Sequence, residues 1–103
     1  MLTTKMTNEN GDLIISLEGR LDTLTSPGFE KELEQYLPEV KSLTLDVEQV
    51  EYISSAGLRT ILAAQQFMEE QDLPDVKIVN INSEVEEIFT VTGFDKMVDA
   101  VYD

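Results

Sequence analysis

Two adjacent hydroxyl side chains, those of Ser54 and Ser55, hold the position in this sequence that is best suited to chemistry. They follow an apolar, strand-like run and open a segment whose apolar residues recur at helical spacing. A hydroxyl at a helix start can cap free backbone N–H groups, and those groups together with the helix dipole favour a negative group there. Either serine is therefore a candidate helix cap, a candidate phosphorylation site or both. Arg59, four residues after Ser55, could pair with a phosphate.

The composition argues against catalysis and against a metal centre. The chain has no histidine and no cysteine, so a serine nucleophile would lack its usual general base. Asp46, Glu48 and Glu51 are hard oxygen ligands, but they lack the ordered spacing and central glycine of a calcium loop. Asp46 could also be the acceptor of a phospho-aspartate receiver, but the chain starts with a hairpin and has no early acidic pair. We therefore expect neither an enzyme nor a bound cofactor or metal.

The formal net charge of -14 restricts the class of partner. Nucleic acids and anionic membrane surfaces are bound by basic patches, and the 7 Lys and Arg residues here are scattered. An acidic surface suits a partner with a basic face, although it could equally serve solubility alone. No apolar run approaches the ~18 residues that span a bilayer, and no basic-then-apolar leader starts the chain. We expect a cytoplasmic protein that does not insert into a membrane.

Alternating apolar residues and turn signals predict the strands. The predicted ranges are 2–8, 12–18, 42–47 and 76–81. Asn10-Gly11 between the first two ranges predicts a tight hairpin. Residues 46–51 are rich in acids and are interpreted as a connector, while residues 97–102 are compatible with a final short strand or a helical turn.

The first predicted helix begins at Pro27 and ends before Pro38, since proline suits a helix start and cannot continue a helix. Ser26 is its expected N-cap, with Thr25 as the competing cap. Its remaining face is charged and is expected to lie in water. The expected buried residues are Phe29, Leu33, Tyr36 and Leu37.

A second helix is predicted over 55–71, and a third from a cap at Ser83 to Gly93. Gln65 lies within the apolar stripe of the second helix, a conflict that the pattern leaves open. The other expected members of that stripe are Leu58, Ile61, Leu62, Met68 and, at its edge, Ala64. A hairpin followed by alternating helices and strands predicts an α/β fold, with residues 1–103 as a single domain and the helices packed on a mixed sheet.

Three motifs, in this order and spacing, resemble the STAS-domain anti-sigma-factor antagonists. Residues 19–22 with Thr25 resemble the Gly-x-Leu-Asp-x-x-Thr motif of that family. The strand 43–46 followed by 52–58 resembles its central strand and its Asp-Ser-Ser-Gly-Leu signature, and residues 91–94 resemble its late segment. The resemblance covers nearly the whole chain and implies a STAS-like domain.

The resemblance implies a partner switch. In this family the unphosphorylated antagonist binds an anti-sigma factor that is also a serine kinase, and the sigma factor is thereby freed. The kinase then phosphorylates and inactivates the antagonist, and a PP2C-type phosphatase restores it; any nucleotide in the complex belongs to the kinase. Aligning Gly57-Leu58 with the Gly-Leu of the family places the phosphorylation site at Ser55. Ser54, which stands where the family has an acid, is the alternative acceptor.

The implied partner-binding surface combines the loop after the second strand with the start of the second helix. Its residues are Asp22, Thr25, Ser54, Ser55, Ala56, Gly57, Leu58 and Arg59. The alternative function is an accessory subunit or scaffold of a transporter or stress-signalling complex, without a phospho-switch, in which Ser55 only caps the helix. Neighbouring kinase and phosphatase genes would favour the first interpretation, and neighbouring permease genes the second.

Overall fold

Five strands form one mixed sheet in the spatial order β1-β2-β3-β4-β5. β1 and β2 pair antiparallel, whereas β2, β3, β4 and β5 run parallel to one another. The computed structural model describes residues 1–102. Its strands are β1 Leu2–Glu9, β2 Asp12–Leu21, β3 Ser42–Ile53, β4 Lys77–Val79 and β5 Asp99–Ala100. The predicted opening hairpin is confirmed, with Asn10 and Gly11 in its turn at φ values of 57° and 97°.

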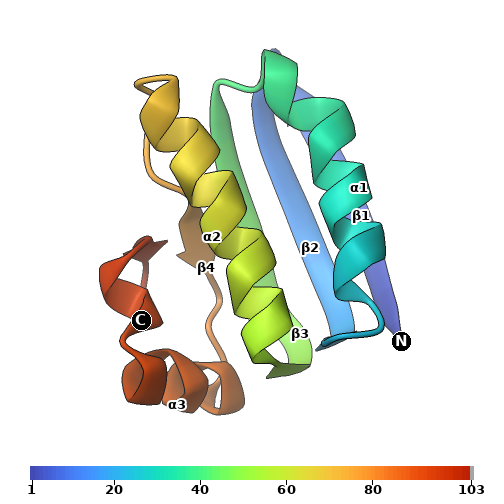
Figure 1. Cartoon of the computed structure of the whole chain (residues 1–103), viewed down its shortest axis with the longest axis vertical. Coiled ribbons are helices and arrows are strands. Elements are labelled where there is room, and N and C mark those ends of the chain that lie inside the picture. Colours follow the sequence, from blue (N-terminus) through green and yellow to red (C-terminus); the bar gives the residue numbers. More distant parts are fainter. Residues whose placement is uncertain (103) are drawn as a thin grey trace.

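The helices leave one face of this sheet uncovered. They are α1 Ser26–Tyr36, α2 Ser55–Glu70 and α3 Ser83–Thr92, with short 3-10 turns at η1 Leu37–Glu39 and η2 Phe94–Lys96. α1 and α2 lie side by side over the sheet, and α3 lies at the end of the molecule where α2 begins (Figure 1). The described residues thus form the predicted α/β domain, a mixed sheet that starts with a hairpin and carries helices.

Alternation along the strands explains why one face of the sheet is buried. Ile15 of β2 and Leu45 of β3 face the helices and are fully buried, while their neighbours Ile14 and Thr44 face away. The helices add Phe29, Leu33, Ile61, Met68, Val85 and Phe89 to the same core. This core holds α2 on the sheet and so fixes the position of its first residue.

β3 runs to Ile53, so the interpretation of residues 46–51 as a connector is wrong. Glu48 and Gln49 are both exposed and break the alternation, whereas the valines on either side of them are buried. The register between β2 and β3 shifts along this stretch, as at a β-bulge. The strand therefore continues through the irregularity and leads directly into Ser54.

Other boundaries differ from the prediction in smaller ways. β2 extends past residue 18 to Leu21, and β4 covers only 77–79 of the predicted 76–81. β5 provides the final short strand, one of the two options predicted for 97–102. α3 ends at Thr92, and Gly93 terminates it as predicted, since its φ of 73° favours glycine.

Two predicted helix caps are wrong. Ser26 is the first residue of α1, and Thr25 holds the cap position without a capping hydrogen bond from its side chain. Asn82 caps α3 in place of Ser83, because its side-chain oxygen accepts the N–H of Val85 at 2.9 Å. The amide nitrogen of Asn82 also donates to backbone carbonyls of β3, at 2.8 to 3.1 Å. These long-range hydrogen bonds explain why Asn82 is the cap, and a local sequence pattern could not have predicted them.

The buried faces of two helices also differ from the prediction. Tyr36 of α1 is 38% exposed, and Leu58 and Leu62 of α2 are only partly buried. Gln65 is buried, and its amide oxygen accepts the buried N–H of Val76 at 2.7 Å. The conflict in the apolar stripe of α2 is thereby resolved. A polar side chain is needed at this position because the buried N–H of Val76, just before β4, requires a hydrogen-bond acceptor.

Candidate functional site

The start of α2 separates the two candidate hydroxyls. Ser54 is the N-cap residue, and its Oγ accepts the N–H of Gly57 at 3.3 Å. Ser55 is the first helical residue and is exposed, and its hydroxyl has no hydrogen-bond partner within residues 1–102. The first bond within the helix is donated by the Leu58 N–H to the Ser54 carbonyl at 2.9 Å. Ser54 therefore does the capping, and the geometry does not support a purely capping role for Ser55.

Gly57 allows the start of α2 to approach the end of β2. A Cβ atom on Gly57 would lie 2.7 Å from the Leu21 carbonyl oxygen and 2.8 Å from the Leu21 Cγ. The Ser54 N–H donates to the same carbonyl at 2.9 Å. The structure thus brings together the two predicted parts of the site, the helix start and the loop 22–25 that follows Leu21.

Reciprocal hydrogen bonds shape the loop 22–25. The Asp22 N–H donates to Thr25 Oγ1 at 2.9 Å, and Asp22 Oδ1 accepts the N–H groups of Leu24 and Thr25 at 3.0 and 3.1 Å. The Thr25 hydroxyl donates to the Arg20 carbonyl at 2.8 Å. The polar side-chain atoms of Asp22 and Thr25 therefore stabilise the conformation of the loop. Leu24, which the sequence analysis did not select, is 89% exposed on this loop.

The charge on Asp22 is stabilised by its surroundings. Desolvation raises the pKa of this carboxyl, but hydrogen bonds from Thr25 and Leu24 and the charge of Arg20 outweigh it, so the pKa lies below its ordinary value of 3.8. The Nε of Arg20 is 3.6 Å from Asp22 Oδ2, and its guanidinium lies 4.8 Å from the centre of the Tyr52 ring. Arg20 thereby connects the loop to the end of β3.

Ala56 and Arg59 line a recess between α1 and α2. The recess has a volume of about 420 Å³ and is also lined by Thr23, Ser26, Pro27, Glu30, Thr60 and Ala63. The Ser26 Oγ is buried there without a hydrogen-bond partner among the described residues. Arg59 is exposed, and within residues 1–102 no ion pair engages it. Its guanidinium is therefore available to bind an anionic group.

A second hollow, the α2–α3 groove, lies on the other side of the α2 start. It has a volume of about 450 Å³ and is lined by Glu51, Tyr52, Ile53, Ser55, Leu58, Glu84, Glu87, Ile88, Val91 and Thr92. The sequence analysis selected only Ser55 and Leu58 from this set, because the α3 residues are distant in the sequence. The available signal was Val91, an apolar residue that lies off the buried face of α3 and is 80% exposed.

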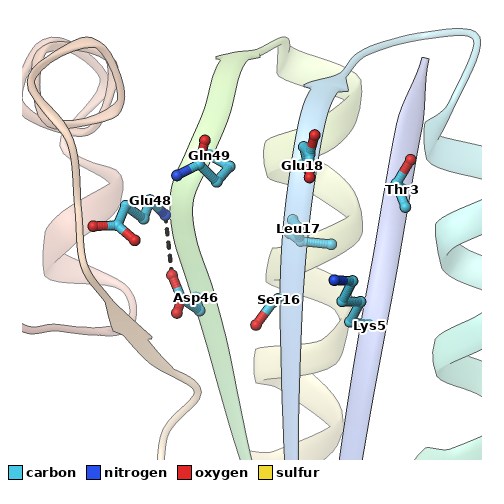
Figure 2. Close-up of a pocket in the computed structure, with 8 residues that line it drawn as sticks. All are labelled: Thr3, Lys5, Ser16, Leu17, Glu18, Asp46, Glu48 and Gln49. Atoms are coloured by element: carbon cyan, nitrogen blue, oxygen red, sulfur yellow. Dashed lines mark hydrogen bonds between the residues drawn. The ribbon is translucent and has the colours of Figure 1, made fainter.

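A third hollow lies on the open face of the sheet, with the helices behind it (Figure 2). It is lined by Thr3, Lys5, Ser16, Leu17, Glu18, Asp46, Glu48 and Gln49. The carboxylate of Asp46 is used here for structure, since it accepts the Glu48 N–H at 3.1 Å and the side-chain amide of Asn80 at 2.9 Å. None of the residues that line this hollow belongs to the predicted site.

Residues 3–103 match the STAS domain family, and the chain belongs to this family. BtrV of Bordetella bronchiseptica, named as an anti-sigma factor antagonist, is 31% identical over 87 residues, which cover 82% of this chain and 73% of BtrV. An anti-sigma factor antagonist from Mycobacterium paratuberculosis has a TM-score of 0.81 at 21% identity, over 100% of this chain and 87% of that one. The Bacillus cell fate determinant SpoIIAA, in its phosphorylated form, has a TM-score of 0.75 at 13% identity, over 98% and 93% of the two chains.

These similarities confirm the STAS-like fold and the resemblance to anti-sigma factor antagonists. Antagonists of this family are regulatory binding proteins and not enzymes. No helix in the described part of the chain is long and apolar enough to cross a bilayer.

Proposed function

We propose that this STAS domain is an anti-sigma factor antagonist whose binding is controlled by phosphorylation of Ser55. One observation carries the proposal: Ser54 caps α2, so the exposed hydroxyl of Ser55 can accept a phosphate without loss of the cap. The unphosphorylated domain binds an anti-sigma factor that is also a serine kinase, and the sigma factor is freed. Phosphate on Ser55 ends this binding, and a PP2C-type phosphatase restores it.

The phosphate acts at the surface and leaves the fold intact. The N–H groups of Ser55 and Ala56 precede the first bond within the helix, so they and the α2 dipole stabilise a phosphate, with Arg59 about one turn further on. The phosphate adds about -1.5 to -2 charges at pH 7. A partner docked over the helix start would have to strip water from that charge, which is expensive. The partner is therefore released while the core of the domain is unchanged.

The partner-binding surface divides into residues that shape it and residues that meet the partner. The shaping residues, by their contacts within the domain, are Asp22, Thr25, Ser54 and Gly57. The contact residues are Leu24, Ser55, Ala56, Leu58 and Arg59, which are exposed or partly exposed. The names of two relatives support a phosphorylation switch: BtrV is named as an anti-sigma factor antagonist, and SpoIIAA is described in a phosphorylated form.

The proposal is tested by a bait experiment in the native lysate. Wild type, Ser54→Ala and Ser55→Ala are each immobilised, retained proteins are identified, ATP is added, and phosphosites are mapped by mass spectrometry. We expect a small serine kinase on all three baits and phosphate on Ser55 of wild type and Ser54→Ala. ATP should release the kinase from these two baits but not from Ser55→Ala.

Two results would change the proposal. Phosphate on Ser54 would keep the switch and move the acceptor by one residue. A retained permease or large scaffold, with no kinase and no phosphate, would replace the antagonist with the accessory-subunit or scaffold function.

A further inference from the structure

The α2–α3 groove exposes apolar side chains from three elements. Leu58 of α2 and Ile88 of α3 are only partly buried, Tyr52 of β3 is 40% exposed, and Val91 at the end of α3 is 80% exposed. These elements meet at the end of the molecule where α2 begins (Figure 1). A contiguous apolar lining on a small acidic domain is typical of a surface that docks a partner.

Three carboxylates also line this groove. Glu51 of β3 and Glu84 and Glu87 of α3 line the groove and are exposed. Neither lysine nor arginine is among the lining residues, and within residues 1–102 no ion pair engages these three glutamates. The three glutamates are called the rim of the groove, and its apolar lining residues are called the floor. No cation among the lining residues balances the rim, which favours a cationic neighbour.

The negative charge of the chain and of the groove indicates whether a second copy of the chain or a different protein binds there. A second copy would bring its own net charge of -14 and the same three carboxylates against this rim. We infer that the α2–α3 groove receives an apolar side chain of the kinase partner, flanked by lysine or arginine side chains that pair with the rim. The inference rests on the function proposed above and extends the docking surface from the loop 22–25 and the α2 start onto α3.

Ser55 lines the same groove, and this places the phosphate against the apolar floor. The added charge by itself would attract the flanking cations more strongly, so charge repulsion does not explain release. The phosphate instead brings a strongly hydrated group beside the site of the apolar side chain, which can no longer be buried there without desolvating it. Release therefore works through loss of the apolar contact.

The test measures the dissociation constant of the purified kinase from the bait experiment by isothermal titration calorimetry. Val91→Ser removes apolar surface from an exposed position and should weaken binding about tenfold. The double variant Glu84→Lys with Glu87→Lys should weaken binding by about the same factor and should flatten its dependence on salt. Urea unfolding should show that Val91→Ser is as stable as wild type and that the double variant is slightly less stable but folded, because Glu84 lies in the first turn of α3, where the helix dipole favours an acid.

Matched controls lie outside the groove. Met97→Ser removes an apolar side chain that is 50% exposed and does not line the groove. The double variant Glu34→Lys with Glu39→Lys makes the same change in net charge on exposed residues in the last turn of α1 and in η1. Both controls should bind the kinase as tightly as wild type.

Each outcome is decisive. If the kinase binds wild type and both groove variants equally, the inference is overturned while the proposed function stands. If the control double variant loses as much affinity as the groove double variant, net charge explains the loss and the inference is again overturned. If no kinase binds wild type, the proposed function fails and the inference falls with it.

Discussion

Ser54 and Ser55 show how backbone geometry assigns different tasks to two identical side chains. Ser54 has an extended backbone, with ψ at 174°, and this directs its Oγ to the N–H of Gly57. Ser55 has entered the helix, where its hydroxyl meets no backbone group and faces solvent. At the residue scale, capping and modification are therefore separable functions that single substitutions can distinguish.

Ser54→Ala should destabilise the domain by about 1 kcal/mol, because the N–H of Gly57 loses its cap. Ser55→Ala should change the stability by less than about 0.5 kcal/mol, as expected for an exposed residue without a partner. Urea unfolding followed by circular dichroism measures both. Equal losses in the two variants would mean that the two hydroxyls share the cap.

Asp22 should give the loop a stability that depends on pH. Its pKa is lowered in the folded protein, so its contribution is complete above 3.8 and is lost as the pH falls through the folded-state pKa. Asp22→Asn should therefore be less stable than wild type at neutral pH, and the gap should narrow below pH 3.8. Urea unfolding of both proteins at several pH values measures the gap. A gap that does not change with pH would rule out a role for the charge.

Close packing at the end of β2 positions α2, and a long-range cap positions α3. Gly57 lets the helix start rest on Leu21, while Asn82 joins the first turn of α3 to the carbonyls of β3. Both contacts place an element relative to the irregular end of the sheet. At the element scale, the site is therefore assembled by the positions of two helix starts and the loop 22–25, and a change in packing should move it.

Gly57→Ala should destabilise the domain by about 1–3 kcal/mol, because the new methyl group would overlap the Leu21 carbonyl and displace α2. Gly28→Ala in α1 is the control, since a Cβ there has no atom within 4 Å and alanine favours helix. The control should be neutral or more stable by up to about 1 kcal/mol. Thermal and urea unfolding compare the two. A neutral Gly57→Ala would show that the start of α2 adjusts without cost.

The molecule as a whole carries 21 acidic and 7 basic residues, and Arg20 with Asp22 is the ion pair found among the described residues. Self-repulsion of this kind works against the compact state and is screened by salt. Adding sodium chloride up to about 0.5 M at neutral pH should therefore raise the thermal unfolding midpoint. Scanning calorimetry in a salt series measures the shift. A midpoint that falls with salt would mean that attractive pairs dominate.

Local signals explain which parts of the fold could be predicted. Asn10-Gly11 defines a hairpin by itself, and the spacing of Ile61, Ala64 and Met68 defines α2 by itself. The path of β3 through Glu48 and Gln49 could not be predicted, because those residues are held in the strand by pairing with β2 and not by an alternating pattern. The length of β3 is therefore determined by its pairing with β2 and not by its own sequence pattern.

The candidate site likewise combines residues that local patterns predict with residues that only the tertiary fold brings together. The hydroxyl pair and the loop 22–25 were selected from local capping patterns and from the family motifs. The glutamates of α3 and Val91 were missed, because only the tertiary fold brings them beside Ser55. Leu24 was missed for the opposite reason: an apolar residue in a short loop carries no pattern at all.

The division of labour between Ser54 and Ser55 has a consequence for timing. Because the cap and the exposed hydroxyl are different residues, adding a phosphate to Ser55 requires no unwinding of α2, and removing it requires no rewinding. If the proposed switch operates, the domain can be phosphorylated and dephosphorylated repeatedly without a change in its fold. The pace of signalling is then set by how often the kinase and the phosphatase meet their substrate, and the domain itself adds no conformational delay.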